Sequence, residues 1–521
     1  MLVKKNMFVK FCEKTSMILC AGVLLLLCIW SFSYIAFMGE AEIVSFYSIH
    51  FTSRILGVSL WAAILIALAW FAKKVGIEKQ IKWIGIAFVI AQASVFLWAT
   101  KAVPVADSWF CFNAAQDAAN DVWNSFTIGG YLYNFPYQAS LVAIEELLFR
   151  MVHNWDTVLI LFRLLNLIAL TVLACSFCGI AKRLFGETAA MLTSILLASS
   201  LPVALYVFFL YGNMISNALA YAAVWSIIVY FDTKRIRNAV GSILLISGAM
   251  AVKPTALIMM LAIGIIWTLV AIKRSQWNMF VGIVLMILVS TLPGKAVQYW
   301  YSERSEVPVN PGVSNLVYIA MGLDIQSENV WFAPGWYTGW SALAYQEANY
   351  DYDEMNRQQI EMLKDNFHYF AEHPQETKEF FLKKIVSQWM DPVFGVWEYI
   401  SQHTESVHLQ ELTRTINEKS YNEGINQILG CLQATVYVMA LYGVICIIKK
   451  GNLVQILPGV IFLGGFLYLV ISEGKAQYSI SFYPSLFPIC AYGILMMKDV
   501  CVSFVGKIKR PKDKPSAFAC N

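Results

Sequence analysis

The chain has 521 residues, of which 58% are hydrophobic and only 14% are charged, and its mean hydropathy is +0.59. So few charges cannot cover the surface of a soluble protein of this length, and a net charge of +4 is not a nucleic-acid-binding signature. Repeated apolar runs of about 18 to 22 residues instead predict an all-α fold, a polytopic bundle of about 12 transmembrane helices.

Basic clusters between the apolar runs set the expected topology. Four lysines precede the first helix, about residues 16–38, and place the N-terminus in the cytoplasm. The second helix, about 56–71, returns to a lysine-rich loop, and the third, about 83–100, leads out to a polar loop at residues 101–137. A surface helix at 137–152 and three further spans then follow up to the cations near residue 235.

The outer loop at 101–137 is rich in aromatic residues and carries Asp107 directly after a predicted helix. An aspartate in this position can take the proton from an attacking alcohol as a general base. The structural alternative is a helix N-cap, because an alanine-rich helical run follows. The residues alone leave both roles open. The neighbouring aromatic side chains suit the C–H faces of sugar rings.

Residues 239–271 are apolar except for Lys253-Pro254-Thr255, and cytoplasmic cations bound the run on both sides. A single helix cannot begin and end on the same side of a membrane, so we expect two short helices with Lys253 at the apex. An ionisable residue at that depth indicates a functional site, and its natural partner is a lipid phosphate. The alternative is a snorkelling lysine that anchors the hairpin.

A ninth helix, about 279–298, leads into the long polar region of the chain. Within it, the patterns predict a helix that ends at Pro374 and another that ends at Asp391-Pro392. Three last helices follow, at about 429–448, 454–471 and 480–497. A polar turn, Glu473-Gly474-Lys475-Ala476-Gln477-Tyr478, precedes the last of them on the outer side.

These patterns divide the chain into three regions. Residues 1–298 form an N-terminal transmembrane region with the catalytic outer loop 101–137, residues 299–428 a mainly helical extracytoplasmic region, and residues 429–521 the C-terminal helices with a basic cytoplasmic tail. We therefore expect a multi-pass cell-membrane protein with both termini in the cytoplasm and its active site on the extracytoplasmic face.

Three separate segments carry a resemblance to a known family. The first is the aspartate after an outward helix, followed by an Ala-rich run, Gly-Gly-Tyr and Tyr-Asn-x-Pro-Tyr-Gln at residues 129–138. The second is the Lys253-Pro254-Thr255 apex, and the third is Glu-x-Lys-x-x-Tyr then Phe-Tyr-Pro at residues 473–484, with Gly335-Trp336-Tyr337 as a further match. In these segments the chain resembles membrane glycosyltransferases of the GT-C superfamily, close to bacterial relatives of protein O-mannosyltransferases and lipid A aminoarabinose transferase.

The resemblance implies a polyprenyl-phosphate-linked sugar donor and transfer, at the outer face, to a cell-envelope glycan, lipid or protein acceptor. Asp107 matches the catalytic aspartate of the family, and Lys253 and Lys475 then contact the donor phosphate. The substrate contacts implied around them are Trp109, Tyr131, Tyr133, Tyr137, Gln138, Glu473 and Tyr478.

Two departures from the family pattern matter. The aspartate follows the third helix instead of the first, so an extra N-terminal hairpin is expected. Ser108 stands where some relatives have a second acid. A divalent cation, Mg or Mn, therefore stays an open cofactor question, and no metal-ligating residues are assigned. Asp117 and Asp121 could supply a second carboxylate or simply form a solvated helix face.

Two other functions fit parts of the pattern. An O-antigen ligase or polysaccharide polymerase also has about twelve helices and a large outer loop, in which arginines such as Arg304, Arg357 and Arg414 would act. A non-enzymatic lipid-sugar flippase or transporter would need charges within several spans, and the chain offers few beyond Arg163 and Lys253.

Overall fold

The computed structural model describes residues 2–39, 42–326, 333–402, 405–408, 410–411 and 424–508, so most of the predicted basic tail lies outside the described residues. Ten helices of this described part are long and apolar enough to cross a membrane. The bent pair Glu187–Ser199 and Leu201–Phe208 and the shorter apolar helix Ile236–Val252 add two more apolar segments. The predicted all-α polytopic bundle is confirmed, and the predicted count of about 12 spans is close.

The long helices of the bundle are α1 (Leu2–Ser31), α2 (Phe51–Val75), α3 (Glu78–Thr100), α7 (Trp155–Phe185), α8 (Glu187–Ser199), α10 (Asn213–Thr233), α11 (Ile236–Val252), α12 (Leu257–Arg274), α13 (Met279–Ser290), α14 (Leu292–Ser305), α21 (Ile425–Lys450), α22 (Leu457–Ile471) and α24 (Leu486–Ile508). Shorter helices that lead to the functional site are α4 (Asp107–Ala119), α5 (Tyr131–Asn134), α6 (Ala139–Val152), α9 (Leu201–Leu205), α15 (Asn315–Gly322), α16 (Trp340–Glu347), α17 (Tyr352–Glu372), α18 (Pro374–Trp389), α19 (Val396–Gln402) and α23 (Ala476–Ser479).

The first helix is shorter at its C-terminal end than predicted. It ends at Ser31, and residues predicted to continue it form strand β1 (Tyr34–Met38), which pairs antiparallel with β2 (Val44–Ser48). Four of the five β1 residues are buried, and the Ala36 N–H donates to the Met390 carbonyl at 3.2 Å. An apolar run therefore reads as helix in the sequence, but strand pairing and contacts with a distant segment override that pattern here.

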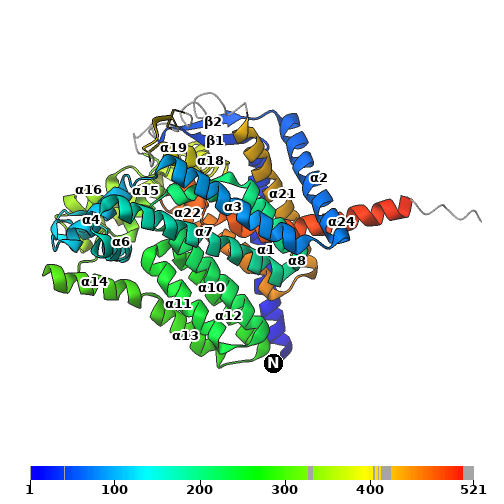
Figure 1. Ribbon diagram of the computed structural model, residues 1–521, viewed down its shortest axis with the longest axis horizontal. Helices are drawn as coiled ribbons and strands as arrows, with labels where there is room; N and C mark the ends of the chain where they lie inside the picture. The colour runs from blue at the N-terminus through cyan, green and yellow to red at the C-terminus, as the bar shows by residue number, and fades with distance from the viewer. Residues whose placement is uncertain are drawn as a thin grey trace, which may run out of the picture.

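The helices form two neighbouring groups around one continuous apolar core. Helix α10 packs against α7 and α11, and α24 packs against α21 and α8. In Figure 1 the short helices α4, α6, α15 and α16 lie together at the left edge of the molecule, beyond the ends of the long helices α3 and α7. The hairpin β1–β2 lies at the top of the view, next to α18 and α19. Polar segments therefore gather around the ends of the long helices.

The apolar run 239–271 is two helices, as predicted. Helix α11 ends at Val252, and a short 3-10 turn, η5 (Pro254–Ala256), begins α12. Lys253 lies at the break in an extended conformation, with φ −144° and ψ 120°. The following proline explains this geometry, because its ring disfavours the helical conformation for the residue before it.

The long polar region between α14 and α21 is mainly helical where it is described. Helix α17 ends at Glu372 and Pro374 begins α18, as the sequence predicted. The end of α18 is buried against the bundle, where the Trp336 indole N–H donates to the Ser387 hydroxyl at 2.9 Å. This region thus continues into the core of the protein through α18.

Candidate active site

A cavity of about 250 Å³ opens where three breaks between helices meet. The loop before α4, the α11–α12 break and the turn before α23 all contribute to its walls. Most of the site residues predicted from the sequence line it, namely Asp107, Lys253, Lys475, Tyr131, Tyr137, Gln138, Glu473 and Tyr478. Side chains from positions far apart in the chain thus share one polar space at the end of an apolar bundle.

Asp107 is the first residue of helix α4 and lies exposed in this cavity. The N-cap position is Ala106, and no side chain caps the helix. The hydroxyl of Ser108 instead accepts a hydrogen bond from the Val105 N–H at 2.8 Å. The Asp107 carboxylate accepts a hydrogen bond from the Tyr211 hydroxyl at 3.2 Å. The capping role is therefore not the one that the structure shows, and the helix N-terminus stabilises a negative charge here.

Lys253 contacts the ring of the same tyrosine, Tyr211. Its Nζ atom is 3.1 Å from the centroid of the Tyr211 ring. Burial lowers the pKa of Lys253 to about 7, and the nearby Cys111, Asp107 and Glu145 partly oppose that shift. An aromatic face stabilises an ammonium without neutralising it. The Lys253 ammonium can therefore still pair with an anion, such as a phosphate, that enters the cavity.

Tyr211 is held in place by a close turn of the chain. Gly212 adopts φ 76°, and a Cβ atom there would lie 2.9 Å from Val252 Cγ1. The side-chain amide of Gln138 donates to the Tyr211 hydroxyl, and the Tyr131 hydroxyl lies 3.2 Å from it. These contacts orient the Tyr211 hydroxyl toward Asp107.

The turn before α23 brings Glu473 and Lys475 into the cavity. Lys475 forms an ion pair with Glu42, and its Nζ lies 5.8 Å from the centroid of the Tyr337 ring. The backbone N–H of Glu473 donates to the Tyr318 carbonyl at 2.7 Å. Burial raises the pKa of the Glu473 carboxyl to about 7, opposed by Lys475 and by a hydrogen bond with Tyr478. Glu473 therefore carries only part of a negative charge near neutral pH.

A buried lysine outside the cavity holds the backbone of this turn in place. Lys384 of α18 donates hydrogen bonds to the Gly322 carbonyl and to the Ser472 carbonyl, the latter at 3.0 Å. Burial lowers the pKa of Lys384 to about 7, and Glu473 partly opposes that shift. Lys384 does not line the cavity. It fixes the backbone that presents Glu473 and Lys475.

Trp109 and Tyr133, predicted as substrate contacts, lie outside this cavity. Trp109 is two residues after Asp107, about 200° around the helix, and its ring packs edge-on against Trp155 at 5.5 Å. Tyr133 stacks on Tyr345 with the ring centroids 6.2 Å apart. Each follows a cavity residue, Asp107 or Tyr131, by two positions in a helix and so lies on a different side of that helix. Trp109 is 47% exposed, and a substrate contact by either side chain stays a prediction.

Several cavity residues were missed from the sequence. Tyr211 and Tyr318 are hydroxyl donors from distant segments, and Glu42 comes from the hairpin turn. The Tyr211-Gly212-Asn213 break after an apolar run was a usable signal, because a glycine at positive φ marks a tight turn. Neither Glu42 nor Tyr318 stands out from its neighbours in the sequence.

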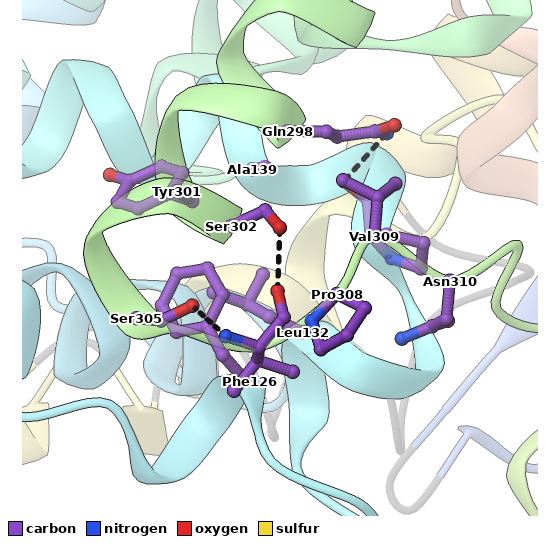
Figure 2. Close-up of a pocket in the computed structure, with 12 residues that line it drawn as sticks. Phe126, Leu132, Ala139, Gln298, Tyr301, Ser302, Ser305, Pro308, Val309 and Asn310 are labelled. Carbon is purple, nitrogen blue, oxygen red and sulfur yellow. Dashed lines mark hydrogen bonds between the residues drawn. The ribbon is translucent and has the colours of Figure 1, made fainter.

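Figure 2 shows a second, much smaller cavity of about 30 Å³ beside α14. The Ser302 hydroxyl donates to the Val307 carbonyl at 2.7 Å, and the Gln298 amide donates to the Pro136 carbonyl at 3.0 Å. No Asp, Glu, His, Lys or Arg side chain is among the described residues that line it. Its volume suits about one or two water molecules and is too small for a sugar or a lipid phosphate. The Ser302–Val307 hydrogen bond joins the loop after α14 to that helix.

Arg304, one of the arginines that a ligase mechanism would use, forms ion pairs outside the cavity. Arg304 of α14 contacts Glu146 at 2.8 Å and Asp121 at 3.4 Å, and Arg150 contacts the same two acids. The Tyr301 hydroxyl also donates to Glu146 at 2.6 Å. This network holds α14 against α4 and α6. Asp121 is therefore part of a structural ion-pair cluster and not a second carboxylate beside Asp107.

The described residues include no group of three or more His, Cys, Asp or Glu side chains placed to hold a metal ion. The carboxylates that line the cavity are Asp107, Glu42 and Glu473, and each has a different partner: Tyr211, Lys475 and Tyr478. This donor set does not fit a resident Mg or Mn ion, and the chemistry below has no step through a metal.

No protein-family model matches the chain, and no curated protein matches its sequence. Solved structures do match. The oligosaccharyltransferase AglB of Archaeoglobus fulgidus, in complex with an inhibitory peptide and a dolichol-phosphate, matches at 10% identity and a TM-score of 0.42, over 83% of this chain and 53% of that one. Its apo form matches at 10% identity and 0.43, over 84% and 52%. ArnT of Cupriavidus metallidurans, bound to undecaprenyl phosphate, matches at 11% identity and 0.32, over 86% and 82%.

Both matched proteins are membrane glycosyltransferases of the GT-C superfamily, the group that the sequence resemblance named. The chain spans about half the length of the archaeal enzyme. At identities of 9–11% and TM-scores of 0.32 to 0.44, this likeness carries no argument about the reaction of this chain. The function is therefore inferred from the cavity itself.

Proposed function

We propose that the protein is a membrane glycosyltransferase that moves a sugar from a polyprenyl-phosphate donor to an acceptor in the cell envelope. One observation carries the proposal. A single cavity at the end of an apolar helix bundle gathers a carboxylate, Asp107, and two lysines, Lys253 and Lys475, from segments more than 100 residues apart in sequence. A base and two cations beside a membrane are the groups that transfer from a lipid phosphate requires.

The reaction can be written as a single displacement with inversion. The acceptor hydroxyl attacks the anomeric carbon of the sugar while the Asp107 carboxylate takes the hydroxyl proton. The bond between the anomeric carbon and the phosphate oxygen breaks, and the phosphate leaves with the electron pair. Lys253 and Lys475 stabilise the negative charge that grows on this phosphate. The products are the glycosylated acceptor and the polyprenyl phosphate.

The tyrosines of the cavity suit the sugar. Tyr131, Tyr137 and Tyr478 line it together with Gln138 and Tyr337. Their rings offer faces to the C–H groups of a sugar, and their hydroxyls and the amide offer hydrogen bonds to its hydroxyls. Glu473, hydrogen-bonded to Tyr478, lies among them. Trp109 and Tyr133 do not line this cavity.

The charges at the helix ends support the proposed orientation. Helices α7, α12 and α21 each carry two basic residues in their last turn. None of these cations lines the catalytic cavity. Because basic residues mark the cytoplasmic side, the cavity is proposed to open on the extracytoplasmic face, with both termini in the cytoplasm.

The rival functions gain no support from the described residues. Arg304 is held by Glu146 and Asp121, Arg357 pairs with Glu354 on the surface of α17, and Arg414 lies outside the described residues. Of the two charges named for a transporter, Arg163 donates to the Ala102 carbonyl at 2.9 Å, and Lys253 lines the cavity. Neither Arg304, Arg357 nor Arg163 lines the cavity.

The test is transfer of radiolabelled sugar from polyprenyl-phosphate donors by the purified full-length protein, comparing wild type with Asp107→Asn. Loss of a general base typically lowers the rate about 100-fold or more. Asp117→Asn, on the same helix but outside the cavity, is the matched control. Donor binding should survive in Asp107→Asn. A variant that stays within about threefold of wild type would remove Asp107 as the base.

A further inference from the structure

The hairpin β1–β2 brings an acidic residue of the N-terminal segment to the cavity. Met38, at the end of β1, packs with Ala333, Trp336 and Ala476. The Gly39 N–H donates to the Ile43 carbonyl at 2.9 Å at the base of the turn. Figure 1 shows the hairpin beside α18 and α19. These contacts fix the hairpin on the same segments that carry the turn with Lys475.

Glu42 lies two residues before the start of β2 and lines the cavity. Its carboxylate forms an ion pair with Lys475, whose side chain is 9% exposed, against 22% for Glu42. A pair so shielded from water is screened less than one on an open surface. Glu42 adopts φ 62°, in the left-handed region, which a residue with a Cβ adopts only where its surroundings fix it. The carboxylate is therefore placed on Lys475 by the fold.

We propose that Glu42 competes with the donor phosphate for Lys475 and so sets the affinity of the site for its donor. This inference rests on the proposed function, in which Lys475 contacts that phosphate. The ammonium is nearly buried between Glu42 and the Tyr337 ring. A phosphate that reaches it must displace the Glu42 carboxylate or lie beside it, and a like charge at that distance repels the phosphate.

The ion pair with Glu42 is the contact that the Lys475 ammonium makes when no donor is bound. A buried cation without a partner is costly, and Glu42 supplies the partner. The same carboxylate can return to Lys475 when the phosphate product leaves. Lys253 differs, because its amine lies on the Tyr211 ring and, among the described residues, forms no ion pair with a carboxylate. Removal of Glu42 should therefore act through Lys475 alone.

The experiment measures binding of polyprenyl phosphate to the full-length protein in detergent by titration calorimetry. Glu42→Gln removes the charge, and Glu42→Asn does so with a residue that tolerates the left-handed conformation. Both should lower the dissociation constant about fivefold, the order expected when a competing, partly shielded ion pair is removed. Glu361→Gln, an exposed acid on α17 outside the cavity, is the matched control and should leave it unchanged.

The variant Lys475→Met distinguishes phosphate binding by Lys475 from the competition by Glu42. In that background Glu42→Gln should have no further effect on binding, because the shared cation is gone. If Lys475→Met binds polyprenyl phosphate like wild type, the phosphate-binding role of Lys475 is wrong, and the competition with it. If Lys475→Met weakens binding while both Glu42 variants bind no tighter than wild type, the competition alone is refuted. Melting temperatures of all variants identify any that fail to fold, and either Glu42 variant suffices.

Discussion

Donor binding should weaken as pH rises, because Lys253 must be protonated to hold a phosphate. Burial lowers the pKa of Lys253 to about 7, so the amine is mostly charged one unit below that value and mostly neutral one unit above it. If only the ammonium binds, the apparent dissociation constant rises about tenfold between about pH 6 and about pH 8. The affinity is thus highest on the acidic side and is lost as pH rises through the pKa of Lys253.

The assay is calorimetric titration with a polyprenyl-phosphate sugar, a phosphodiester whose single charge does not change in this range. Lys253→Arg is the decisive comparison, since its guanidinium stays charged throughout. Glu473 adds a slope of the same sign, because burial raises its pKa to about 7 and its ionisation repels the phosphate. Glu473→Gln removes that part, and Glu145→Gln tests the buried carboxyl, also near Lys253, whose pKa burial raises well above its ordinary value. A flat profile in wild type, or the full tenfold change retained in Lys253→Arg, refutes the reasoning.

Three further outcomes are expected. Glu146→Ala should lower the free energy of unfolding by about 3 kcal/mol, because it leaves Arg150 and Arg304 without their buried partner. The measurement is denaturation in detergent, with Glu361→Gln as the control that should change stability little. An equal loss in both variants would contradict the structural role of the network. Tyr211→Phe should reduce transfer by about tenfold or more by removing the hydrogen bond to Asp107, whereas Trp109→Phe should stay near wild type. Chelation with EDTA should leave the transfer rate unchanged, and a loss restored by Mg or Mn would show that the carboxylates of the cavity recruit a cation with the substrate.

The sequence was most informative where polar residues interrupt apolar runs. Lys253 was singled out because a bilayer tolerates such a group only where it lines a cavity or pairs internally. Asp107 and Lys475 were singled out because they stand in polar outer segments next to apolar runs, and all three line the same cavity. The two-helix interpretation of the Lys253 run also held, because topology and helix length left no other solution. Their roles in the reaction stay predictions.

The features that the sequence did not predict share one physical cause. The local sequence pattern does not determine which way a side chain points or which distant segment it contacts. Trp109 was predicted from composition, but its position two residues after Asp107 turns it toward Trp155. The strand β1 was predicted as helix, because its apolar residues meet their partners only through β2 and the end of α18. Glu42 and Tyr318 become cavity residues only when the fold brings distant segments together. Glu42 pairs with Lys475, 433 residues further along the chain, and the Tyr318 hydroxyl lies next to that of Tyr137, 181 residues before it.

Three carboxyl groups line the cavity, and Glu42 is paired with Lys475. The surroundings of the other two, Asp107 and Glu473, decide which one can act as the base. Glu473 is buried, lies near Lys384 and Lys475, and has its pKa raised by burial to about 7, so part of the protein carries it protonated near neutral pH. Asp107 is exposed in the cavity at a helix N-terminus and accepts a hydrogen bond from Tyr211. Groups whose environments separate in this way take different roles in proton transfer. In the proposed reaction a protonated Glu473 donates a hydrogen bond to the sugar or the phosphate, and the Asp107 carboxylate takes the proton of the acceptor.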